Sequence, residues 1–244
     1  MQHHSSLDGE VDMATQARRR ATSALLIAMA ASGLVACGGG PPTATSTGAT
    51  STVTVATDGT AAQNVPGKAN IFGAGLDVPP APAGGGPGVL PVMWPLPPGT
   101  AGVVTFPTVT GEVNPIQGMA EPVGAAGDGG QYGTTDVKSF GGISGIIHRR
   151  NGMFLVGVFL TSGSPAATAP ERLDFTDRDM SQLLEPEIGQ TFLVGDGRGV
   201  TVRVPDGATR LFLGFADGYL YKGDPGWYDN NAGHLTVTVA VGPG

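Results

Sequence analysis

Glycine and proline are spread along the whole chain and limit what it can fold into. The 244 residues include 41 Gly and 20 Pro. Together they make up a quarter of the chain, about twice their ordinary share of roughly 12%. Because both residues interrupt helices, long helices cannot dominate the fold. From residue 67 onward, short apolar runs are broken by Gly, Pro, Asn and Asp, and this pattern predicts an all-β sandwich or jelly roll.

Seven apolar runs are the predicted strands: Val103–Val109, Ile143–His148, Met153–Leu160, Thr191–Val194, Val200–Val204, Ala208–Phe215 and Leu235–Val241. The last run alternates apolar with weakly polar residues, which predicts that its aliphatic side chains face the core (Leu235, Val237, Val239 and Val241). The segment Phe154–Leu160 is apolar at nearly every position and predicts a central strand covered on both faces. One short helix is predicted between a Thr176 cap and Leu184.

The overall composition favours a folded, weakly charged domain. Hydrophobic residues make up 40% of the chain and charged residues only 14%, which is enough apolar material for one sizeable core. The net charge is −7, and the basic residues are scattered except for Arg18, Arg19 and Arg20. A basic surface of the kind that binds nucleic acid is therefore not expected.

The N-terminal part predicts export. Arg18–Arg20 form a basic head, and the apolar residues 21–36 that follow are too few to span a bilayer. The only cysteine, Cys37, ends the sequence Leu34-Val35-Ala36-Cys37, which resembles a bacterial lipoprotein box. In that pattern the signal is cleaved before the cysteine, whose thiol then carries lipid. An ordinary secretory signal with an incidental cysteine is the alternative.

The chain is therefore divided into three parts. Residues 1–36 are interpreted as an upstream extension and a lipoprotein signal peptide, with Met13 as the more natural start. Residues 37–66 follow as the lipidated cysteine and a flexible linker rich in Thr, Ala and Gly. Residues 67–244 form the predicted β-sandwich domain. Because Gly38 rather than Asp follows Cys37, resemblance to lipoproteins of two-membrane bacteria favours the outer membrane.

Catalytic motifs are poorly represented, and the chain is predicted not to be an enzyme. His148 and His234 stand alone near strand ends, and Gly142-Ile143-Ser144-Gly145 falls one position short of a nucleophile elbow. Phosphate-binding, dinucleotide-binding and zinc-helix motifs are not found. A pair of carboxylates for glycoside hydrolysis would be a spatial arrangement, and nothing in the sequence singles one out.

The unusual segment is 217–233, DGYLYKGDPGWYDNNAG, between two predicted strands. It holds four of the six Trp and Tyr residues of the chain and several oxygen-bearing side chains (Asp217, Asp224, Asp229, Asn230 and Asn231). Ca²⁺ takes six to eight oxygen ligands, and a glycine-rich loop can turn several of them inward. The alternative is a long hairpin-like loop in which Asp and Asn cap turns while the rings seal the end of the sandwich.

Several segments carry a resemblance to known families. VTFPTVTGEV (103–112), FGGISGI (140–146), MFLVGVFL (153–160), IGQTFLVGDG (188–197) and VPDGATRLFLGFADG (204–218) with PGWYDNNAGHLTVTV (225–239) resemble exported bacterial domains that often carry a PEP-CTERM sorting tail. The C-terminal half is similar to the calcium-dependent bacterial galactophilic lectin, a galactose-binding-like β-sandwich. The resemblance implies a galactose-binding-like jelly roll and a bound Ca²⁺.

The resemblance to the lectin also implies a ligand set. Asp217 would supply a carboxylate, Asn230 and Asn231 side-chain oxygens, and Trp227 a backbone carbonyl. A further carbonyl would come from around residues 112–116. In the lectin two sugar hydroxyls approach the calcium ion. Its sugar-contacting His and Gln have no match in residues 127–140, GDGGQYGTTDVKSF, so galactose specificity is not implied.

The sequence thus predicts a membrane-anchored, extracytoplasmic lipoprotein with a calcium-dependent, carbohydrate-binding domain. The expected partners are the membrane, through the N-terminal lipid, and a glycan or extracellular polysaccharide. Four aromatic residues are the candidate sugar contacts: Tyr219, Tyr221, Trp227 and Tyr228. The alternative function is a calcium-stabilised structural or matrix-associated domain that binds no glycan.

Overall fold

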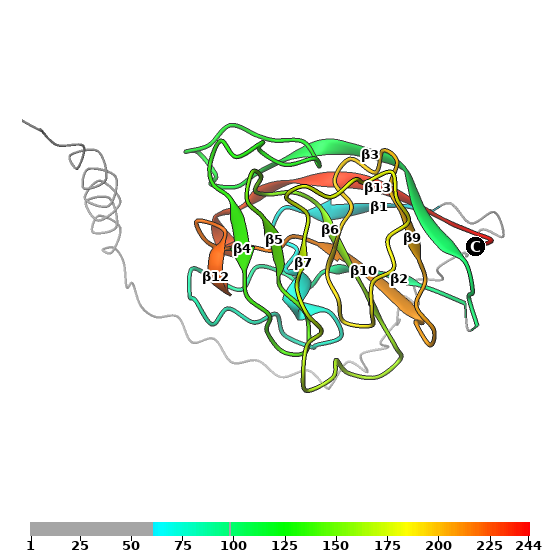
Figure 1. The fold of residues 1–244 in the computed structure, drawn as a ribbon. Coiled ribbons are helices and arrows are strands. Elements are labelled where there is room, and N and C mark those ends of the chain that lie inside the picture. Colours follow the sequence, from blue (N-terminus) through cyan, green and yellow to red (C-terminus); the bar gives the residue numbers. More distant parts are fainter. Residues whose placement is uncertain (1–60, 98) are drawn as a thin grey trace, which may run out of the picture. The chain divides into compact units, whose positions relative to one another are not determined.

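The computed structural model describes residues 61–97 and 99–244, and this part of the chain is nearly all β (Figure 1). Two short 3-10 helices, η1 (Ile71–Gly73) and η2 (Tyr228–Asn230), interrupt the strands. The strands are β1 (Ala61–Pro66), β2 (Val92–Pro95), β3 (Val103–Asn114), β4 (Thr135–Val137), β5 (Ile146–His148), β6 (Val156–Leu160), β7 (Leu173–Asp174), β8 (Phe192–Leu193), β9 (Thr201–Arg203), β10 (Arg210–Gly214), β11 (Gly218–Tyr219), β12 (Lys222–Pro225) and β13 (Ala232–Gly242).

The strands form three sheets. The first has the order β1-β13-β3-β9 and the second the order β2-β10-β6-β8, and all neighbours in both are antiparallel. The third, β11-β12-β4-β5-β7, is mixed, with β12 parallel to β4 and β5 parallel to β7. In Figure 1 the long strands β3, β13 and β1 run together over β6, β10 and β2. The stacked antiparallel sheets are consistent with a β-sandwich.

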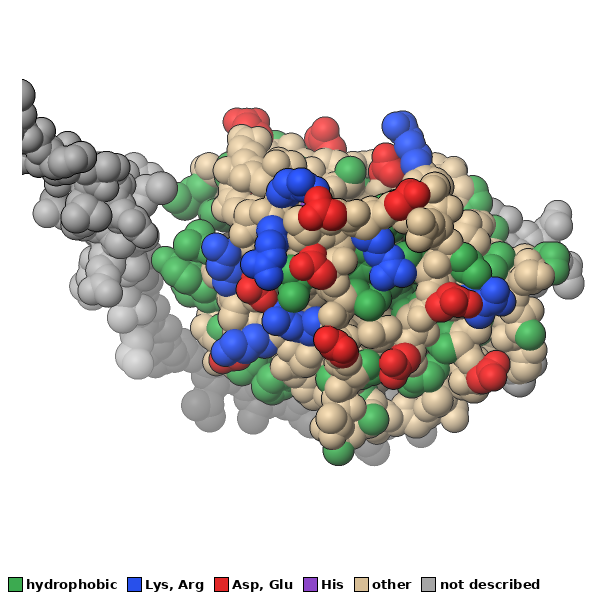
Figure 2. Space-filling view, viewed as in Figure 1, with side chains coloured by type: hydrophobic (Ala, Val, Ile, Leu, Met, Phe, Trp, Pro, Cys, Tyr) green, Lys and Arg blue, Asp and Glu red, His purple; other side chains and the backbone are tan. Residues whose placement is uncertain are grey.

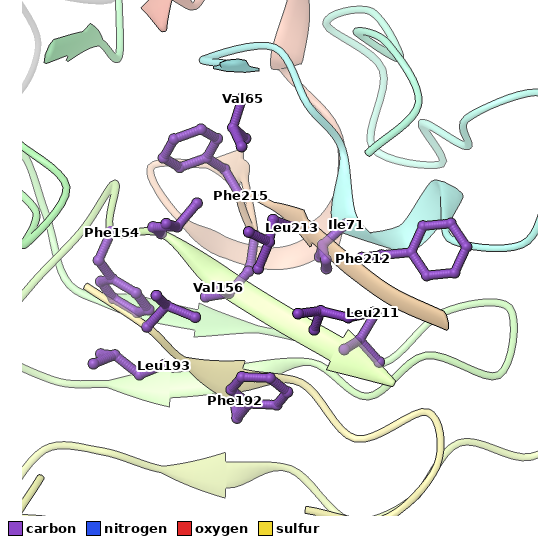
Figure 3. Close-up of a cluster of buried hydrophobic side chains, with 14 of the residues drawn as sticks. Val65, Ile71, Phe154, Val156, Phe192, Leu193, Leu211, Phe212, Leu213 and Phe215 are labelled. Atoms are coloured by element: carbon purple, nitrogen blue, oxygen red, sulfur yellow. The ribbon is translucent and has the colours of Figure 1, made fainter. Parts of the chain in front are cut away.

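The hydrophobic core lies on and around the second sheet. All five residues of β6 are buried, which confirms the predicted central strand. Figure 3 shows aliphatic and aromatic side chains from β6, β8, β10 and the first strand in one cluster. Within the core, the rings of Phe159 and Phe192 stack with centroids 5.3 Å apart. The aromatic ring of Phe192 also lies against Gly157, where no side chain would fit.

The alternation predicted for the last strand is confirmed at three of its four core positions. Leu235, Val237 and Val239 are buried, as predicted. Val241 is 38% exposed, and that part of the prediction is wrong. The residue lies near the end of β13, beyond the point between Thr238 and Ala240 where the register with β3 shifts.

The first strand corrects the predicted domain boundary. Ala61–Pro66, placed in the flexible linker by the sequence, pairs residue by residue with β13 as an antiparallel edge strand. Val65 is fully buried, so this short segment contributes to the core. The folded domain therefore begins no later than Ala61. Cys37 and the predicted signal peptide lie outside the described residues.

The predicted helix from Thr176 to Leu184 is absent from the structure. The carboxylate of Asp174 accepts the Thr176 backbone N–H at 2.8 Å, and that of Asp179 accepts the Ser181 backbone N–H at 2.9 Å. Such local hydrogen bonds compete with those of a helix and hold the segment in turns. The Thr176 hydroxyl accepts a hydrogen bond from the Arg149 backbone instead of capping a helix.

The surface shown in Figure 2 carries acidic and basic side chains intermixed rather than one continuous charged area. Several of them are joined as exposed ion pairs, for example Arg203 with Glu185 at 2.7 Å and Lys138 with Asp224 at 3.4 Å. Exposed pairs of this kind contribute little to stability. Among the described residues, no helix is long and apolar enough to cross a membrane.

Candidate metal centre

Asp217 follows β10 and is the one carboxylate at the centre of the candidate site. Asp217 is only 4% exposed, because it follows the buried strand β10 and lies inside the domain before the chain turns at Gly218. One carboxylate oxygen accepts the Gly218 backbone N–H at 2.7 Å, and the other accepts the Asn231 side-chain amide at 2.9 Å. Burial raises the pKa of Asp217 from 3.8 to about 7, and these two hydrogen bonds oppose the shift.

The two asparagines lie at the end of η2, immediately before β13. The Asn231 side chain is fully buried, and its Nδ2 donates to both the Asp217 carboxylate and the Gly67 carbonyl. The Oδ1 atoms of Asn230 and Asn231 are both buried and have no hydrogen-bond partner. Buried polar atoms are nearly always satisfied in folded proteins, so unpartnered amide oxygens on two consecutive residues require an explanation.

A hard cation beside the Asp217 carboxylate is one explanation that the Asn231 side chain allows. A half-turn of the Asn231 amide would exchange Nδ2 for Oδ1 and would present an oxygen beside the Asp217 carboxylate. Carboxylate, amide and backbone carbonyl oxygens are the ligands that Ca²⁺ prefers. The described residues contain no cluster of three or more His, Cys, Asp or Glu side chains, so a carboxylate-rich or thiolate site is not formed by them.

Trp227, the predicted carbonyl ligand, precedes η2 in a left-handed conformation with φ of 69°. A positive φ is uncommon for a residue other than glycine. Leu220 and Tyr221 also have a positive φ. Three of the four non-glycine residues with a positive φ in the described chain therefore lie in the 217–233 loop. Strain of this kind is often found at binding sites, where the surrounding structure holds it in place.

The other two acidic residues of the loop lie apart from the candidate ligands. Asp224 is exposed and pairs with Lys138 at 3.4 Å. Asp229 is exposed and accepts the Gly88 backbone N–H at 3.0 Å. The candidate centre thus has a single formal negative charge, which favours weak calcium binding.

The structure separates the four predicted sugar contacts into two groups. Tyr221 is 5% exposed, and Tyr228 is fully buried with its hydroxyl donating to the Phe215 carbonyl and accepting from the Asp217 N–H. Neither ring can serve as an open stacking surface, and these two predictions are wrong because both rings fill the interior. Tyr219 is 58% exposed, and its ring lies 5.2 Å from that of the partly exposed Trp227.

Two neighbouring segments also contact the site. The Gln117 backbone N–H donates to the Asn230 carbonyl at 2.7 Å, just past the early loop implied by the resemblance. A glycine-rich segment, residues 83–88, covers the loop: Trp227 donates its backbone N–H to the Gly84 carbonyl, and Gly85 lies so close to the indole that a Cβ there would clash. Three consecutive glycines, Gly84-Gly85-Gly86, are the feature of the sequence that indicates this close approach to the loop, because glycine has no Cβ.

The raised pKa of Asp217 predicts how the metal-free chain responds to pH. Between about pH 4 and 7 the folded chain keeps a proton on Asp217 that the unfolded chain releases, so this group's stabilising contribution is lost as the pH rises through 7. In chelator, Asp217→Asn should therefore gain stability relative to the wild type between pH 5.5 and 8, as measured by urea unfolding. A stability difference that does not change with pH would contradict this prediction.

The comparisons with known proteins add no assignment. No known protein family and no curated protein shows a significant match to this chain.

Proposed function

We propose that residues 61–244 are a calcium-dependent, carbohydrate-binding domain of the galactose-binding-like jelly-roll type. The observation that carries the proposal is the direct contact between the Asn231 side-chain amide and the buried Asp217 carboxylate, in a loop where the Oδ1 atoms of Asn230 and Asn231 are buried without a partner. These are the residues that the resemblance to the calcium-dependent lectin implies as ligands. The resemblance implies a backbone carbonyl from Trp227, and the Gly67 carbonyl, which accepts from the Asn231 amide, would be a further oxygen.

Carbohydrate would bind on the outer side of the same loop. Tyr219 offers an exposed ring on which the apolar face of a sugar can stack, next to the partly exposed indole of Trp227. A calcium ion held by one carboxylate and a few neutral oxygens would keep coordination positions open for sugar hydroxyls. The rings and the ion together would bind a glycan more strongly than either alone.

A glycan array probed with the full chain, with and without chelator, tests this function. We expect weak binding that chelator abolishes, and we expect Tyr219→Ala to weaken it about tenfold while the calcium response remains. Leu220→Ala is the matched control, because it removes an exposed aliphatic side chain from the same loop. Tyr228→Phe is not a suitable control, because the Tyr228 hydroxyl accepts the Asp217 backbone N–H. Calcium binding without any glycan signal would favour a calcium-stabilised structural domain.

We also propose that the domain is held at the cell envelope, with the outer membrane as the favoured location, through lipid on Cys37. The support is the sequence alone: the basic head, the apolar run and the lipoprotein-like box. Several acyl chains would anchor the protein firmly, since each buried CH₂ contributes about 0.8 kcal/mol. Cys37→Ser should abolish lipid labelling in a bacterial host and release the protein from the membrane fraction. Labelling that persists in the variant would refute the anchor.

A further inference from the structure

The turn between β11 and β12 carries an unusual residue at its tip. Tyr219 and Lys222 are the last paired residues of the two antiparallel strands, so Leu220 and Tyr221 form a two-residue turn. Both have a left-handed backbone, with φ of 53° and 57°. Asn-Gly and similar pairs are the usual residues of such a turn, because a bulky side chain is unfavourable at a positive φ. Leucine at this position therefore needs a reason outside the turn itself.

Packing in the core explains the position of Tyr221 but not that of Leu220. Tyr221 is 5% exposed, and its ring lies so close to Gly152 that a Cβ there would clash. Leu220 is 58% exposed, and so is Tyr219 beside it. An exposed leucine on a strained backbone adds little to the stability of the domain, and strain of this kind is often retained at functional positions.

Leu220 belongs to a continuous apolar surface that is open to solvent. It adjoins Tyr219 in the chain, and the Tyr219 ring lies 5.2 Å from the ring of the partly exposed Trp227. Figure 2 shows hydrophobic side chains projecting from the edge of the domain where Figure 1 labels β12. We call Tyr219, Leu220 and Trp227 the apolar tip.

The charges around the apolar tip are of both signs. Lys222 follows the turn and is exposed, and Asp229 is exposed on the same loop. The Asp224 carboxylate lies 3.4 Å from the Lys138 ammonium, so these two charges largely offset each other. A partner recognised by its charge is therefore not favoured. The tip offers apolar and aromatic surface, which is stabilised by any phase that removes it from water.

The proposed anchor of the chain identifies that phase as a lipid bilayer. If lipid on Cys37 holds the chain at a membrane, only the 23 residues 38–60 separate that membrane from β1. A flexible linker of that length, as the sequence predicts, has a root-mean-square reach of about 24–29 Å. The domain is then held close to the bilayer at a high effective concentration, so a weak affinity of the apolar tip for lipid is sufficient.

We propose that the apolar tip inserts into the surface of the bilayer that carries the anchor, with Leu220 among the acyl chains and the rings of Tyr219 and Trp227 at the level of the head groups. Tyrosine and tryptophan are enriched at that level in membrane proteins, whereas leucine is favourable in the hydrocarbon. The Lys222 ammonium can reach the head groups while its aliphatic stem lies along apolar surface. The proposal rests on the proposed lipid anchor, and it requires neither calcium nor a glycan.

Coupling the full chain through Cys37, its only cysteine, to maleimide-bearing phosphatidylcholine vesicles tests the proposal. The chain has two tryptophans, and Trp94 is only 6% exposed, so Trp227 reports on the apolar tip. In chelator, vesicles with brominated acyl chains should quench the tryptophan emission relative to plain vesicles, because bromine quenches rings that lie within the bilayer. Leu220→Ser should reduce this quenching at least about twofold, since it removes the side chain that the bilayer would bury. Trp227→Phe should abolish the quenching.

Val241→Ser is the matched control. It also replaces an exposed aliphatic residue, but Val241 lies near the end of β13 that is far from the 217–233 loop, so the quenching should stay as in the wild type. Equal quenching in Leu220→Ser and the wild type would overturn the insertion. So would emission that brominated lipid leaves unchanged, as expected if the tip packs against a second copy of the chain.

The outcomes also separate this proposal from those on which the domain's function depends. The coupling is chemical, so the vesicle result does not depend on whether a cell attaches lipid to Cys37. Asp217→Asn should leave the quenching intact, because insertion needs no metal ion. Quenching that appears only with calcium would overturn the proposal, since it would assign the membrane contact to an ion in the 217–233 loop.

Discussion

Calcium at a hundredfold excess over its dissociation constant is expected to raise the free energy of unfolding of the chain by about 3 kcal/mol. The reason is that only the folded loop brings the Asp217 carboxylate next to the Asn231 amide. The unfolded chain has no such site, so binding energy becomes folding energy. Urea unfolding of the chain in chelator and in a calcium series measures the effect. The expected dissociation constant is about 10⁻⁴ to 10⁻³ M, which is the range of weakly binding extracellular calcium modules.

Asp217→Asn should have opposite effects on the free energy of unfolding with and without calcium. The variant loses the only carboxylate at the candidate centre, so the calcium response should disappear. Without calcium at pH 8, the same variant should be more stable than the wild type, because a buried charge is removed. A mutation that merely damaged the fold would instead lower stability under both conditions.

Asp224→Asn is the matched control for the calcium experiment. It makes the same chemical change in the same loop, at an exposed residue whose contact is a surface ion pair with Lys138. Its stability and calcium response should stay close to those of the wild type. A calcium effect that survives in Asp217→Asn, or that Asp224→Asn removes, would place the ion elsewhere.

Phe192→Ala should cause the largest loss of stability of any substitution considered, about 3 to 5 kcal/mol. Strand β8 is only two residues long, yet the Phe192 ring is fully buried, stacks on Phe159 and fills the space over Gly157. Truncation would leave a cavity that the rigid strands β6 and β10 cannot close. Urea unfolding with constant slope and a lower midpoint would show the loss.

Phe140→Ala is the control for that substitution. It removes the same ring from a residue that is 37% exposed, so it should cost less than about 1.5 kcal/mol. Similar losses in the two variants would mean that the Phe192 ring is not a central part of the core.

The longest apolar patterns in the sequence were sufficient to predict the central elements of the fold. β6 is apolar at nearly every position because both of its faces are covered. In β13, apolar and polar residues alternate because only one of its faces is covered. β1 could not be found in this way, since AAQNVP contributes one large apolar side chain and owes its conformation to pairing with β13. The helix expected at 176–184 does not form, because Asp174 and Asp179 accept hydrogen bonds from the nearby Thr176 and Ser181 backbone N–H groups.

The candidate site, like the fold, could be predicted only in part from the sequence. Residue type singled out the 217–233 loop, the resemblance to the lectin implied Asp217, Asn230 and Asn231 as ligands, and the fold brings the first and last of these into direct contact. The same reasoning failed for Tyr221 and Tyr228, because a tyrosine is suited both to an exposed sugar platform and to a buried position with a hydrogen-bonded hydroxyl. Only the path of the chain after β10 decides between them.

If the proposed lipid anchor on Cys37 and the proposed ligand at the 217–233 loop are both present, the pairing of β1 with β13 has a mechanical consequence. A pulling force would enter the domain at Ala61 and leave it through the loop before Ala232. These two points lie at opposite ends of the paired strands, because Ala61 is opposite Val239 and Pro66 is opposite His234. The force would therefore act along the strands and load their hydrogen bonds together in shear. They would not open one after another, so this edge of the sandwich is built to resist extension.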